Sequence, residues 1–393
     1  MKILIIEDDQ LVANIYRNKF AIEGFQAETA RDGEVGLELM QSFRPDAVLL
    51  DLVLPGVSGL DVMRKIRANK DSEKVPIVVF SNTYLSQMVE DAWKAGATKC
   101  LSKSRSTPQQ VIEAVRSAMK SNSVAEAMPA AKKSPTPRAK ASELQGEDDE
   151  EFQAQLREDF LASLPNSLVE IRTLLQGLTR ADNAAGRLKH IQDLYSRTHS
   201  LSSNAGIAGA ADIALMADAL EALLKELQDK PGNINASTLR TVASAVDFMG
   251  MLFENSSAPD RQFPPAEVLV VDDEAISRRA VAFALEKAHM KSICVEDPMK
   301  AMDILLQKKF DLIFLDVDMP NMNGFELCTK IRTLPQSGKT PVVFVTGLND
   351  LENRANSTMS GGNDFIAKPF LFIELTVKAL MHVQRSRIAA GKK

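Results

Sequence analysis

The sequence predicts two doubly wound α/β domains that flank an all-α four-helix bundle. Three observations lead to this prediction. The two ends of the chain form an internal repeat with a constant offset of 265 positions. Within each copy, short β-branched runs alternate with helical patterns, as in a parallel sheet covered by helices. The middle of the chain instead repeats apolar residues every three or four positions, which is typical of amphipathic helices.

Two linkers divide the 393-residue chain into three segments. Residues 121–150 lack apolar periodicity and combine Pro, Ser and Ala with opposed blocks of charge, which is typical of a flexible tether. Residues 255–265 form a shorter break that is rich in Pro and Ser. We therefore expect α/β domains at 1–120 and 266–388 and a helical domain at 151–254.

The composition argues against several classes of protein. Lys and Arg number 47 against 52 Asp and Glu, and the net charge of -5 disfavours a nucleic-acid or anionic-membrane surface. No apolar run approaches the ~18 residues of a membrane span, and the chain turns acidic at Glu7, too early for a signal peptide. The three cysteines, Cys100, Cys294 and Cys328, do not form a disulfide framework by spacing. These features predict a cytoplasmic protein without membrane insertion or nucleic-acid binding.

The repeat aligns polar and turn residues without any insertion. Two independent segments would not match at this many positions over such a length, so we expect the same fold in both copies. The matched pairs are Asp8 with Asp273, Asp51 with Asp316, Pro55 with Pro320, Gly59 with Gly324, Ser81 with Thr346, and Lys103 with Lys368.

Five strands are expected in each copy. In the first copy they fall at 2–7, 25–29, 47–52, 76–81 and 99–103. In the second copy they fall at 267–272, 291–295, 312–317, 341–347 and 364–369. Five strands alternating with five helices predict the flavodoxin-like (βα)5 arrangement, in which a site lies at the carboxyl ends of the strands.

Four helices are expected in the middle segment. They cover 151–178 (with a break near Pro165), 183–205, 207–228 and 236–254. Their connections are short, which favours an antiparallel bundle.

Acidic residues gather where the predicted strands end. Glu7 and Asp8 end the first strand of the first copy, and Asp51 ends the third. Three carboxylates at one sheet edge resist ionisation unless a cation lies among them, and oxygen ligands suit Mg²⁺. Lys103 and Ser81 add a positive charge and a hydroxyl that suit phosphoryl oxygens. The second copy offers the same set at Asp272, Asp273, Asp316, Thr346 and Lys368.

Both copies resemble the receiver domain of two-component response regulators. The resemblance implies that Asp51 and Asp316 accept phosphate. It implies one Mg²⁺ per receiver, with Asp8 and Asp273 as direct ligands and Glu7 and Asp272 holding metal-bound water. The backbone carbonyls of Val53 and Asp318 occupy the position of a further ligand. The residues implied to contact the phosphate or to switch with it are Ser81, Lys103, Thr346, Lys368 and Phe365.

The first copy departs from the receiver pattern at two positions. The family has Lys-Pro after the fifth strand, as in Lys368-Pro369, whereas the first copy has Lys103-Ser104. Proline there normally holds a cis peptide, and a cis bond without proline costs ~3 kcal/mol, so we expect Lys103 to lie differently. The aromatic switch residue matches Phe365 but falls on Cys100 in the first copy. We expect the first receiver to transmit phosphorylation differently from the second.

One histidine in the middle segment is a candidate phosphate carrier. His199 lies at the edge of a buried helical stripe formed by Ile191, Leu194, Thr198, Leu201 and Ala205, which leaves one ring nitrogen in water. A neutral imidazole is nucleophilic near pH 7. The run from His199 to Ala210 resembles the histidine-containing phosphotransfer (HPt) domain, although Ser202 and Ser203 replace the usual Lys and Gly. His190 lies on the opposite face of this helix, and we expect no chemical role for it.

Together these features predict a phosphorelay protein that passes phosphoryl groups between receiver aspartates and a bundle histidine. No Gly-rich nucleotide loop is visible, so the phosphate is expected from a sensor histidine kinase or a small phosphodonor. A downstream receiver or effector protein is the expected output. A phosphorylation-dependent scaffold, in which the bundle serves only docking or dimerisation, remains the alternative. The sequence does not indicate the oligomeric state.

Overall fold

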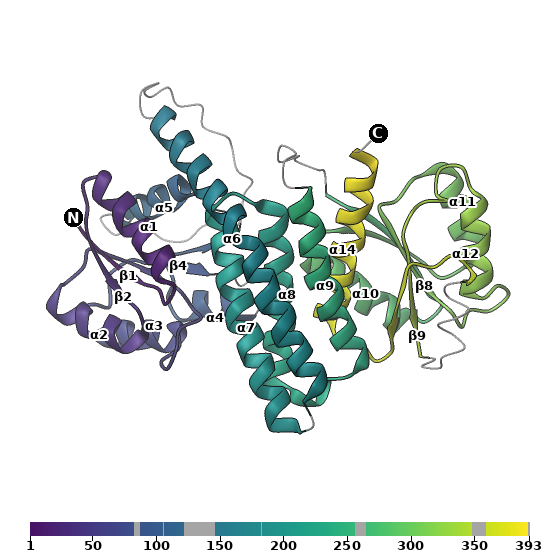
Figure 1. Cartoon of the computed structure of the whole chain (residues 1–393), viewed down its shortest axis with the longest axis horizontal. Helices are drawn as coiled ribbons and strands as arrows, with labels where there is room; N and C mark the ends of the chain where they lie inside the picture. Colours follow the sequence, from purple (N-terminus) through teal and green to yellow (C-terminus); the bar gives the residue numbers. More distant parts are fainter. Residues whose placement is uncertain are drawn as a thin grey trace. The chain divides into compact units, whose positions relative to one another are not determined.

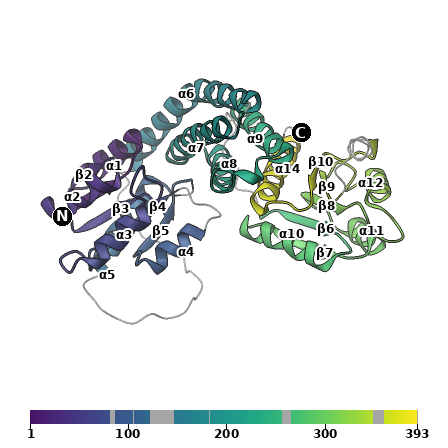
Figure 2. The same ribbon diagram turned by 90° about the horizontal axis from the view of Figure 1, so that it is seen from below.

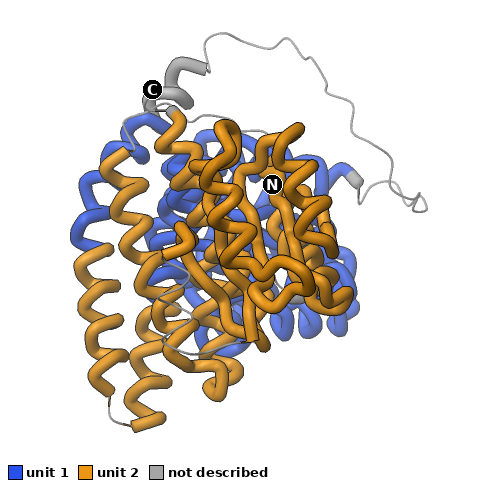
Figure 3. The backbone as a smooth tube through the Cα atoms, turned by 90° about the vertical axis from the view of Figure 1, so that its right-hand side faces the viewer, with its two compact units in different colours: residues 1–167, 196–218 blue, residues 168–195, 219–393 orange. Residues whose placement is uncertain are grey.

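The computed structural model describes residues 1–81, 87–104, 106–121, 146–181, 183–255, 265–347 and 359–391. The chain divides into two compact units, shown in different colours in Figure 3. The first unit comprises residues 1–167 and 196–218, and the second comprises residues 168–195 and 219–393. Each unit contains one parallel β-sheet and part of a helical bundle, and each is described by itself.

The sheet of the first unit has five parallel strands in the order β2-β1-β3-β4-β5. Every residue of β3 and β4 is buried, which explains why their sequences are apolar on both sides. This is the predicted doubly wound order. The strands are β1 (Lys2–Ile6), β2 (Gln26–Ala30), β3 (Ala47–Leu50), β4 (Ile77–Ser81) and β5 (Lys99–Ser102).

Five helices cover the two faces of this sheet (Figure 1). Residues of α1 and α5, including Tyr16 and Val115, pack in one apolar core. Residues of α2 and α3, including Met40 and Met63, pack in a second core on the other face. The helices are α1 (Gln10–Ile22), α2 (Gly33–Ser42), α3 (Gly59–Ala68), α4 (Gln87–Lys94) and α5 (Pro108–Ser121). We call β1 to α5 the first α/β domain.

The second unit repeats this architecture, with parallel strands in the order β10-β9-β8-β6-β7. Helices α10 and α14 lie on one side of the sheet, and α11 and α12 on the other (Figure 2). The strands are β6 (Glu267–Val271), β7 (Lys291–Val295), β8 (Leu312–Asp316), β9 (Val342–Thr346) and β10 (Asp364–Ala367). The helices are α10 (Ala275–Lys287), α11 (Pro298–Gln307), α12 (Gly324–Thr333) and α14 (Phe372–Gly391). The helix expected between β9 and β10 falls largely outside the described residues.

The internal repeat is confirmed, because each strand of this second α/β domain begins 265 residues after its counterpart. The repeated glycines have a steric reason. A Cβ on Gly59 would lie 2.2 Å from the Asp51 carbonyl oxygen, and a Cβ on Gly324 would lie 2.1 Å from that of Asp316. Only glycine lets the helix start this close to the strand end.

The middle of the chain forms the predicted helical bundle (Figure 1). Its helices are α6 (Gly146–Arg180), α7 (Ala184–Ile207), α8 (Ala211–Asp229) and α9 (Ala236–Glu254). The first three of these helices each continue from one compact unit into the other. None of the helices in the described ranges combines the length and apolar character needed to cross a membrane.

The predicted break near Pro165 is wrong, because α6 continues through this residue. A proline inside a helix costs about 3 kcal/mol. Burial of one large apolar side chain is worth about 1.5–3 kcal/mol. The stripe of α6 is buried on both sides of the proline, and the sum of these burials outweighs one lost hydrogen bond. The buried residues of the stripe are Phe160, Leu164, Leu168 and Ile171.

Candidate functional site

The strand ends of the first α/β domain bring one lysine and two carboxylates together. Glu7 follows β1, Asp51 follows β3 and Lys103 follows β5. The Lys103 ammonium donates to Glu7 Oε1 at 2.7 Å and to Asp51 Oδ2 at 2.5 Å. All three side chains are buried. We expected Lys103 to lie differently from Lys368, its counterpart in the second domain. Both lysines nevertheless contact the same two repeat positions, which are Glu7 and Asp51 for Lys103 and Asp272 and Asp316 for Lys368.

Burial and the lysine charge set the ionisation of this group in opposite directions. Burial raises the pKa of Glu7 to about 8, and the nearby Lys103 only partly offsets it. Burial also raises the pKa of Asp51, but the charge of Lys103 and then the nearby His199 ring outweigh it and hold this pKa well below its usual range. Asp51 is thus ionised, which is the form in which a carboxylate is nucleophilic.

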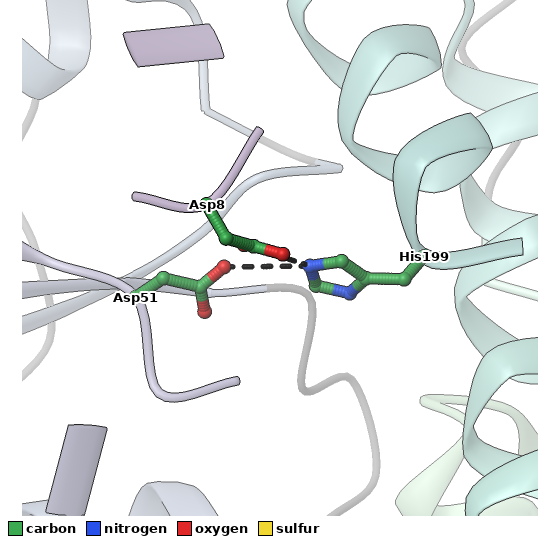
Figure 4. Close-up of side chains that lie close together, drawn as sticks. All are labelled: Asp8, Asp51 and His199. Atoms are coloured by element: carbon green, nitrogen blue, oxygen red, sulfur yellow. Dashed lines mark ion pairs between the residues drawn. The ribbon is translucent and has the colours of Figure 1, made fainter. Parts of the chain in front are cut away.

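His199 of α7 points toward the carboxylates of Asp8 and Asp51 (Figure 4). Its Nε2 atom lies 3.5 Å from Asp51 Oδ2 and 4.0 Å from Asp8 Oδ1. These residues belong to one compact unit. The structure therefore brings two residues singled out for phosphate chemistry, which lie 148 positions apart in sequence, to within direct contact distance.

The expected exposure of His199 is wrong, because only 3% of the residue is exposed. The helical stripe itself is as predicted, and Ile191, Leu194, Thr198 and Ala205 are completely buried. The edge of the stripe is covered as well, since the strand ends of the first α/β domain pack against this turn of α7. Ser202 and Ser203 are fully buried as well, and Ser202 Oγ donates to the Ala214 carbonyl of α8 at 3.5 Å.

The oxygen atoms at this edge fit a divalent cation. Asp8, Asp51 and His199 each offer a ligand atom, and these atoms lie within 4.8 Å of one another. Asp8 Oδ1 is buried and has no hydrogen-bond partner among the described residues. Asp51 Oδ1 accepts from the Val53 amide at 3.0 Å, so the carbonyl of Val53 belongs to the same turn. A carboxylate oxygen that lacks a donor is suited to a hard cation such as Mg²⁺.

The hydroxyl group expected to contact phosphate ends β4. Ser81 is buried, and its Oγ atom has no hydrogen-bond partner in the part of the chain that the structure describes. A buried hydroxyl without a partner is costly. A phosphoryl oxygen at the neighbouring carboxylate would supply the acceptor.

The second α/β domain carries the matching set. Lys368 Nζ lies 2.9 Å from Asp272 Oδ2 and 3.3 Å from Asp316 Oδ1. Asp272, Asp273 and Asp316 bring their oxygens within 4.8 Å of one another. Burial and then the charge of Asp272 raise the pKa of Asp316, against the lowering effect of Lys368. A cation at this cluster would relieve the repulsion.

Three further features of the second domain concern residues that the sequence analysis singled out. The Lys368–Pro369 peptide bond is cis, whereas Lys103–Ser104 is not. Thr346, the counterpart of Ser81, ends β9 and is buried. Asp318 is exposed, and only its backbone carbonyl was expected to contribute.

Phe365 of β10, the expected switch residue, lies beside the bundle helix α9. Its ring packs against the core of the second domain, and the Arg240 guanidinium lies 5.2 Å from the ring centroid. On the same helix α9, Ser237 Oγ and Thr241 Oγ1 donate to Glu374 Oε1 of α14 at 2.7 Å and 3.0 Å. The sequence analysis did not identify this contact between α14 and α9.

Family models match the three segments separately. The model of the response regulator receiver domain matches residues 3–116 and 268–380, which together exceed half of the chain. The model of the Hpt domain matches residues 155–247. These matches find receiver and Hpt domains and no kinase domain.

Curated relatives match the chain over one receiver-sized region. Protein RcaC of Microchaete diplosiphon is 32% identical over 127 residues, which cover 32% of this chain and 20% of that protein. The transcriptional regulatory protein ResD of Bacillus subtilis is 37% identical over 117 residues, or 29% of this chain and 48% of that protein. The matched region therefore spans half or less of these relatives.

Solved structures match to the same extent. The chemotaxis response regulator CheY4 of Vibrio cholerae is 31% identical, with a TM-score of 0.29, and the match covers 30% of this chain and 99% of that one. The receiver domain of a sensor histidine kinase from Pseudomonas aeruginosa, with a magnesium ion coordinated in its active-site cleft, is 23% identical. It has a TM-score of 0.28, and the match covers 30% of this chain and 98% of that one.

Proposed function

Because the chain belongs to the response regulator receiver family and carries an Hpt domain between its two receivers, we propose that it passes a phosphoryl group between Asp51 and His199. Receiver and Hpt domains together imply a phosphorelay in two-component signalling. The observation that carries the proposal is the 3.5 Å separation of His199 Nε2 and Asp51 Oδ2. Two groups that are held in one site exchange a phosphoryl group in an effectively intramolecular step, which is far faster than transfer between free groups.

The transfer step uses only side chains at this edge. His199, neutral and protonated on Nδ1, attacks the phosphorus of a phosphorylated Asp51 through the Nε2 lone pair. The Nε2–P bond forms while the P–O bond to Asp51 breaks, and the carboxylate leaves with the bonding electron pair. The attacking and leaving atoms are roughly in line in such a step. The reverse step returns the phosphoryl group to Asp51.

Lys103 and Ser81 act on the charge of the transferred group. The Lys103 ammonium is already placed on Asp51 Oδ2, where it neutralises charge that builds up on the phosphoryl oxygens. The buried Ser81 hydroxyl has a proton to donate to another of these oxygens. The corresponding pair in the second receiver is Lys368 and Thr346.

We assign one Mg²⁺ site to each receiver. In the first receiver, Asp8, Asp51 and the Val53 carbonyl would hold the ion, and Glu7 would hold metal-bound water. In the second, Asp273, Asp316 and the Asp318 carbonyl would hold it, and Asp272 would hold the water. When bound, the cation neutralises charge on the phosphoryl oxygens and on the cluster of carboxylates.

The second receiver takes phosphate on Asp316 from a separate source. Its pocket contains all the matched elements, including the acidic cluster, Lys368 and Thr346. The phosphate donor is a sensor histidine kinase or a small phosphodonor, and the output is a downstream receiver or effector protein.

The test is transfer of label to the bundle in the full-length chain. Labelled acetyl phosphate with Mg²⁺ is added to the Asp316→Asn protein, so that only the first receiver can be loaded. We expect a phosphoramidate, which is stable in base and labile in acid. His199→Gln should remove this signal, and His190→Gln should leave it intact, since His190 packs against Gly177 in the other compact unit.

A second control loads the Asp51→Asn, Asp316→Asn protein, which should carry no phosphohistidine. If label appears there, His199 takes phosphate directly from the small donor rather than from Asp51. If the protein with an intact Asp51 never carries a phosphoramidate, from acetyl phosphate or from a cognate kinase, the relay fails and a docking scaffold is the better description.

A further inference from the structure

The residue after the active-site lysine differs between the two receivers, and in the first receiver its side chain forms a hydrogen bond to the bundle. In the second receiver this residue is Pro369, and in the first it is Ser104. Ser104 Oγ donates to Asp218 Oδ2 of α8 at 3.2 Å. Ser102 Oγ lies 2.8 Å from Ser104 Oγ, and with the Ser104 proton directed to Asp218, the Ser102 hydroxyl is the donor in that pair. A chain of two hydrogen bonds thus connects β5 to the bundle.

The Asp218 carboxylate is buried and therefore needs hydrogen-bond donors from the protein. Asp218 is completely buried and Ser104 is only 6% exposed. A buried carboxylate is stable only when donors compensate for the lost hydration. A receiver that presents proline at this position has no hydroxyl to offer and would leave that hydrogen bond of Asp218 unmade. Asp218 therefore favours the first receiver and disfavours a receiver of the Lys-Pro type.

A second contact requires that α7 approach the lysine loop, the residues Lys103 and Ser104 directly after β5, very closely. A Cβ on Gly206 would lie 2.1 Å from the Lys103 carbonyl oxygen and 2.9 Å from the Ser104 Cα atom. Both are backbone atoms, which cannot move aside as a flexible side chain can. Gly206 is seven residues after His199 on the same helix, so this approach and the position of the imidazole are coupled through a rigid element.

We infer that Asp218 and Gly206 of the bundle, together with Ser104 of the first receiver, are specificity residues that select the first receiver over the second as the partner of His199. The inference rests on the proposed relay between Asp51 and His199. None of the three residues touches the transferred group, so they act as positioning residues. Ser104 in place of the usual proline then favours binding of the first receiver to the bundle and is not a loss of function.

The first experiment measures docking without phosphate. Amide hydrogen exchange of residues 206–210 is followed in the full-length protein and in Ser104→Ala. A hydrogen bond to a charged acceptor contributes about 1.5–3 kcal/mol, so exchange should accelerate by about tenfold to hundredfold. Ser104→Thr keeps the hydroxyl and should restore slow exchange. Glu158→Gln, which alters an exposed residue of α6 in the same compact unit, is the matched control and should have no effect.

The second experiment measures selectivity. The initial rate of phosphohistidine formation is compared between the Asp316→Asn protein, loaded on Asp51, and the Asp51→Asn protein, loaded on Asp316. Ser104→Ala and Gly206→Ala should each lower the rate from Asp51 relative to the rate from Asp316 by about tenfold or more. Asp218→Ala in combination with Ser104→Ala should cost less than the sum of the two single changes, because the two side chains share one hydrogen bond.

The outcomes separate the inference from the proposed function. If wild type forms phosphohistidine from Asp51 and the Ser104 and Gly206 variants match it in both exchange and selectivity, the inference is overturned. If wild type never forms phosphohistidine but Ser104→Ala still accelerates exchange and Ser104→Thr restores it, the relay fails and the pairing of the first receiver with the bundle stands.

Discussion

Lys103 and Lys368 occupy matched positions of the internal repeat and each bridges two carboxylates, but Lys103 is completely buried whereas 21% of the Lys368 side chain is exposed. The difference arises at the sheet edge of the first receiver, where α7 lies against the lysine loop. The same set of charges is therefore more strongly desolvated in the first receiver than in the second.

Removal of the two lysines should have unequal effects on stability. Lys103→Met leaves Glu7 and Asp51 buried without their cation, and such a loss costs about 3–5 kcal/mol. Lys368→Met should cost less, because water reaches that site. Amide hydrogen exchange of β3 and β8 measures the two losses in the full-length chain. Lys65→Met, at an exposed position of α3, is the control. Equal losses at the two sites would contradict the role of desolvation.

The two aspartates should be the only sites of acyl phosphate. With labelled acetyl phosphate and Mg²⁺, the Asp51→Asn protein should still carry base-labile label on Asp316, and the Asp51→Asn, Asp316→Asn protein should carry none. Chelation of Mg²⁺ should abolish labelling of both receivers, because the carboxylate clusters then repel the incoming phosphoryl group. Persistent base-labile label in the double variant would place the phosphoacceptor elsewhere.

The second receiver should lose stability in acid through Asp364. Burial raises the pKa of Asp364, but the hydrogen bond to His382 and the charge of Lys378 outweigh it and hold this pKa well below the usual 3.8. Lys378 Nζ donates to Asp364 Oδ2 at 2.6 Å. A group with a depressed pKa stabilises the fold above its unfolded-state pKa and loses this contribution as the pH falls through the folded-state value.

We therefore expect the free energy of unfolding of the second receiver to decrease as the pH is lowered below about 4. This decrease, the acid limb of the stability profile, should be smaller in the Asp364→Asn protein. Hydrogen exchange of β9 and β10 across pH 2–6 measures the effect. Asp303→Asn, at an exposed position of α11, should leave the limb unchanged. An identical acid limb in the Asp364→Asn protein would show that another group is responsible.

Glu374 should hold α14 on α9. It is buried and accepts from the hydroxyls of Ser237 and Thr241. Glu374→Ala leaves the Ser237 hydroxyl without its acceptor and leaves Thr241 Oγ1 only the Ser237 carbonyl, so amides of residues 239–243 should exchange about tenfold faster or more. Glu374→Gln keeps a carbonyl acceptor and should have a smaller effect. Glu286→Ala, at an exposed position of α10, is the control. If Glu374→Ala leaves exchange in α9 unchanged, the contact contributes nothing to docking.

The strands and the strand-end residues could be predicted because they depend on local signals. Buried parallel strands read as continuous apolar runs, and a constant offset of 265 positions fixed where the second set had to lie. The convergence of Asp51 and Lys103 follows from strand order alone, since parallel strands end at one edge. The four bundle helices were predictable from apolar periodicity in the same way.

The errors arose where a distant segment decides the outcome. A helical wheel describes one helix, so it placed His199 at a water-facing edge and could not include the receiver that covers it. Pro165 is a local breaker, but burial on both sides of it is a tertiary effect. Glu374 matches Gln109 in the repeat, and Gln109 is exposed, so even the internal repeat carried no signal for the contact with α9.

The burial of His199 affects any outside protein that competes for the imidazole. A kinase or a separate receiver can reach the ring only in molecules whose own first receiver has moved off. Its apparent dissociation constant is then the intrinsic value divided by the fraction of open molecules, so a chain that is open 1% of the time binds about a hundredfold more weakly. Any change that weakens the contact between the first receiver and the bundle therefore lowers the apparent dissociation constant of the outside protein. It does so by raising the fraction of open molecules, without altering any contact between His199 and that protein.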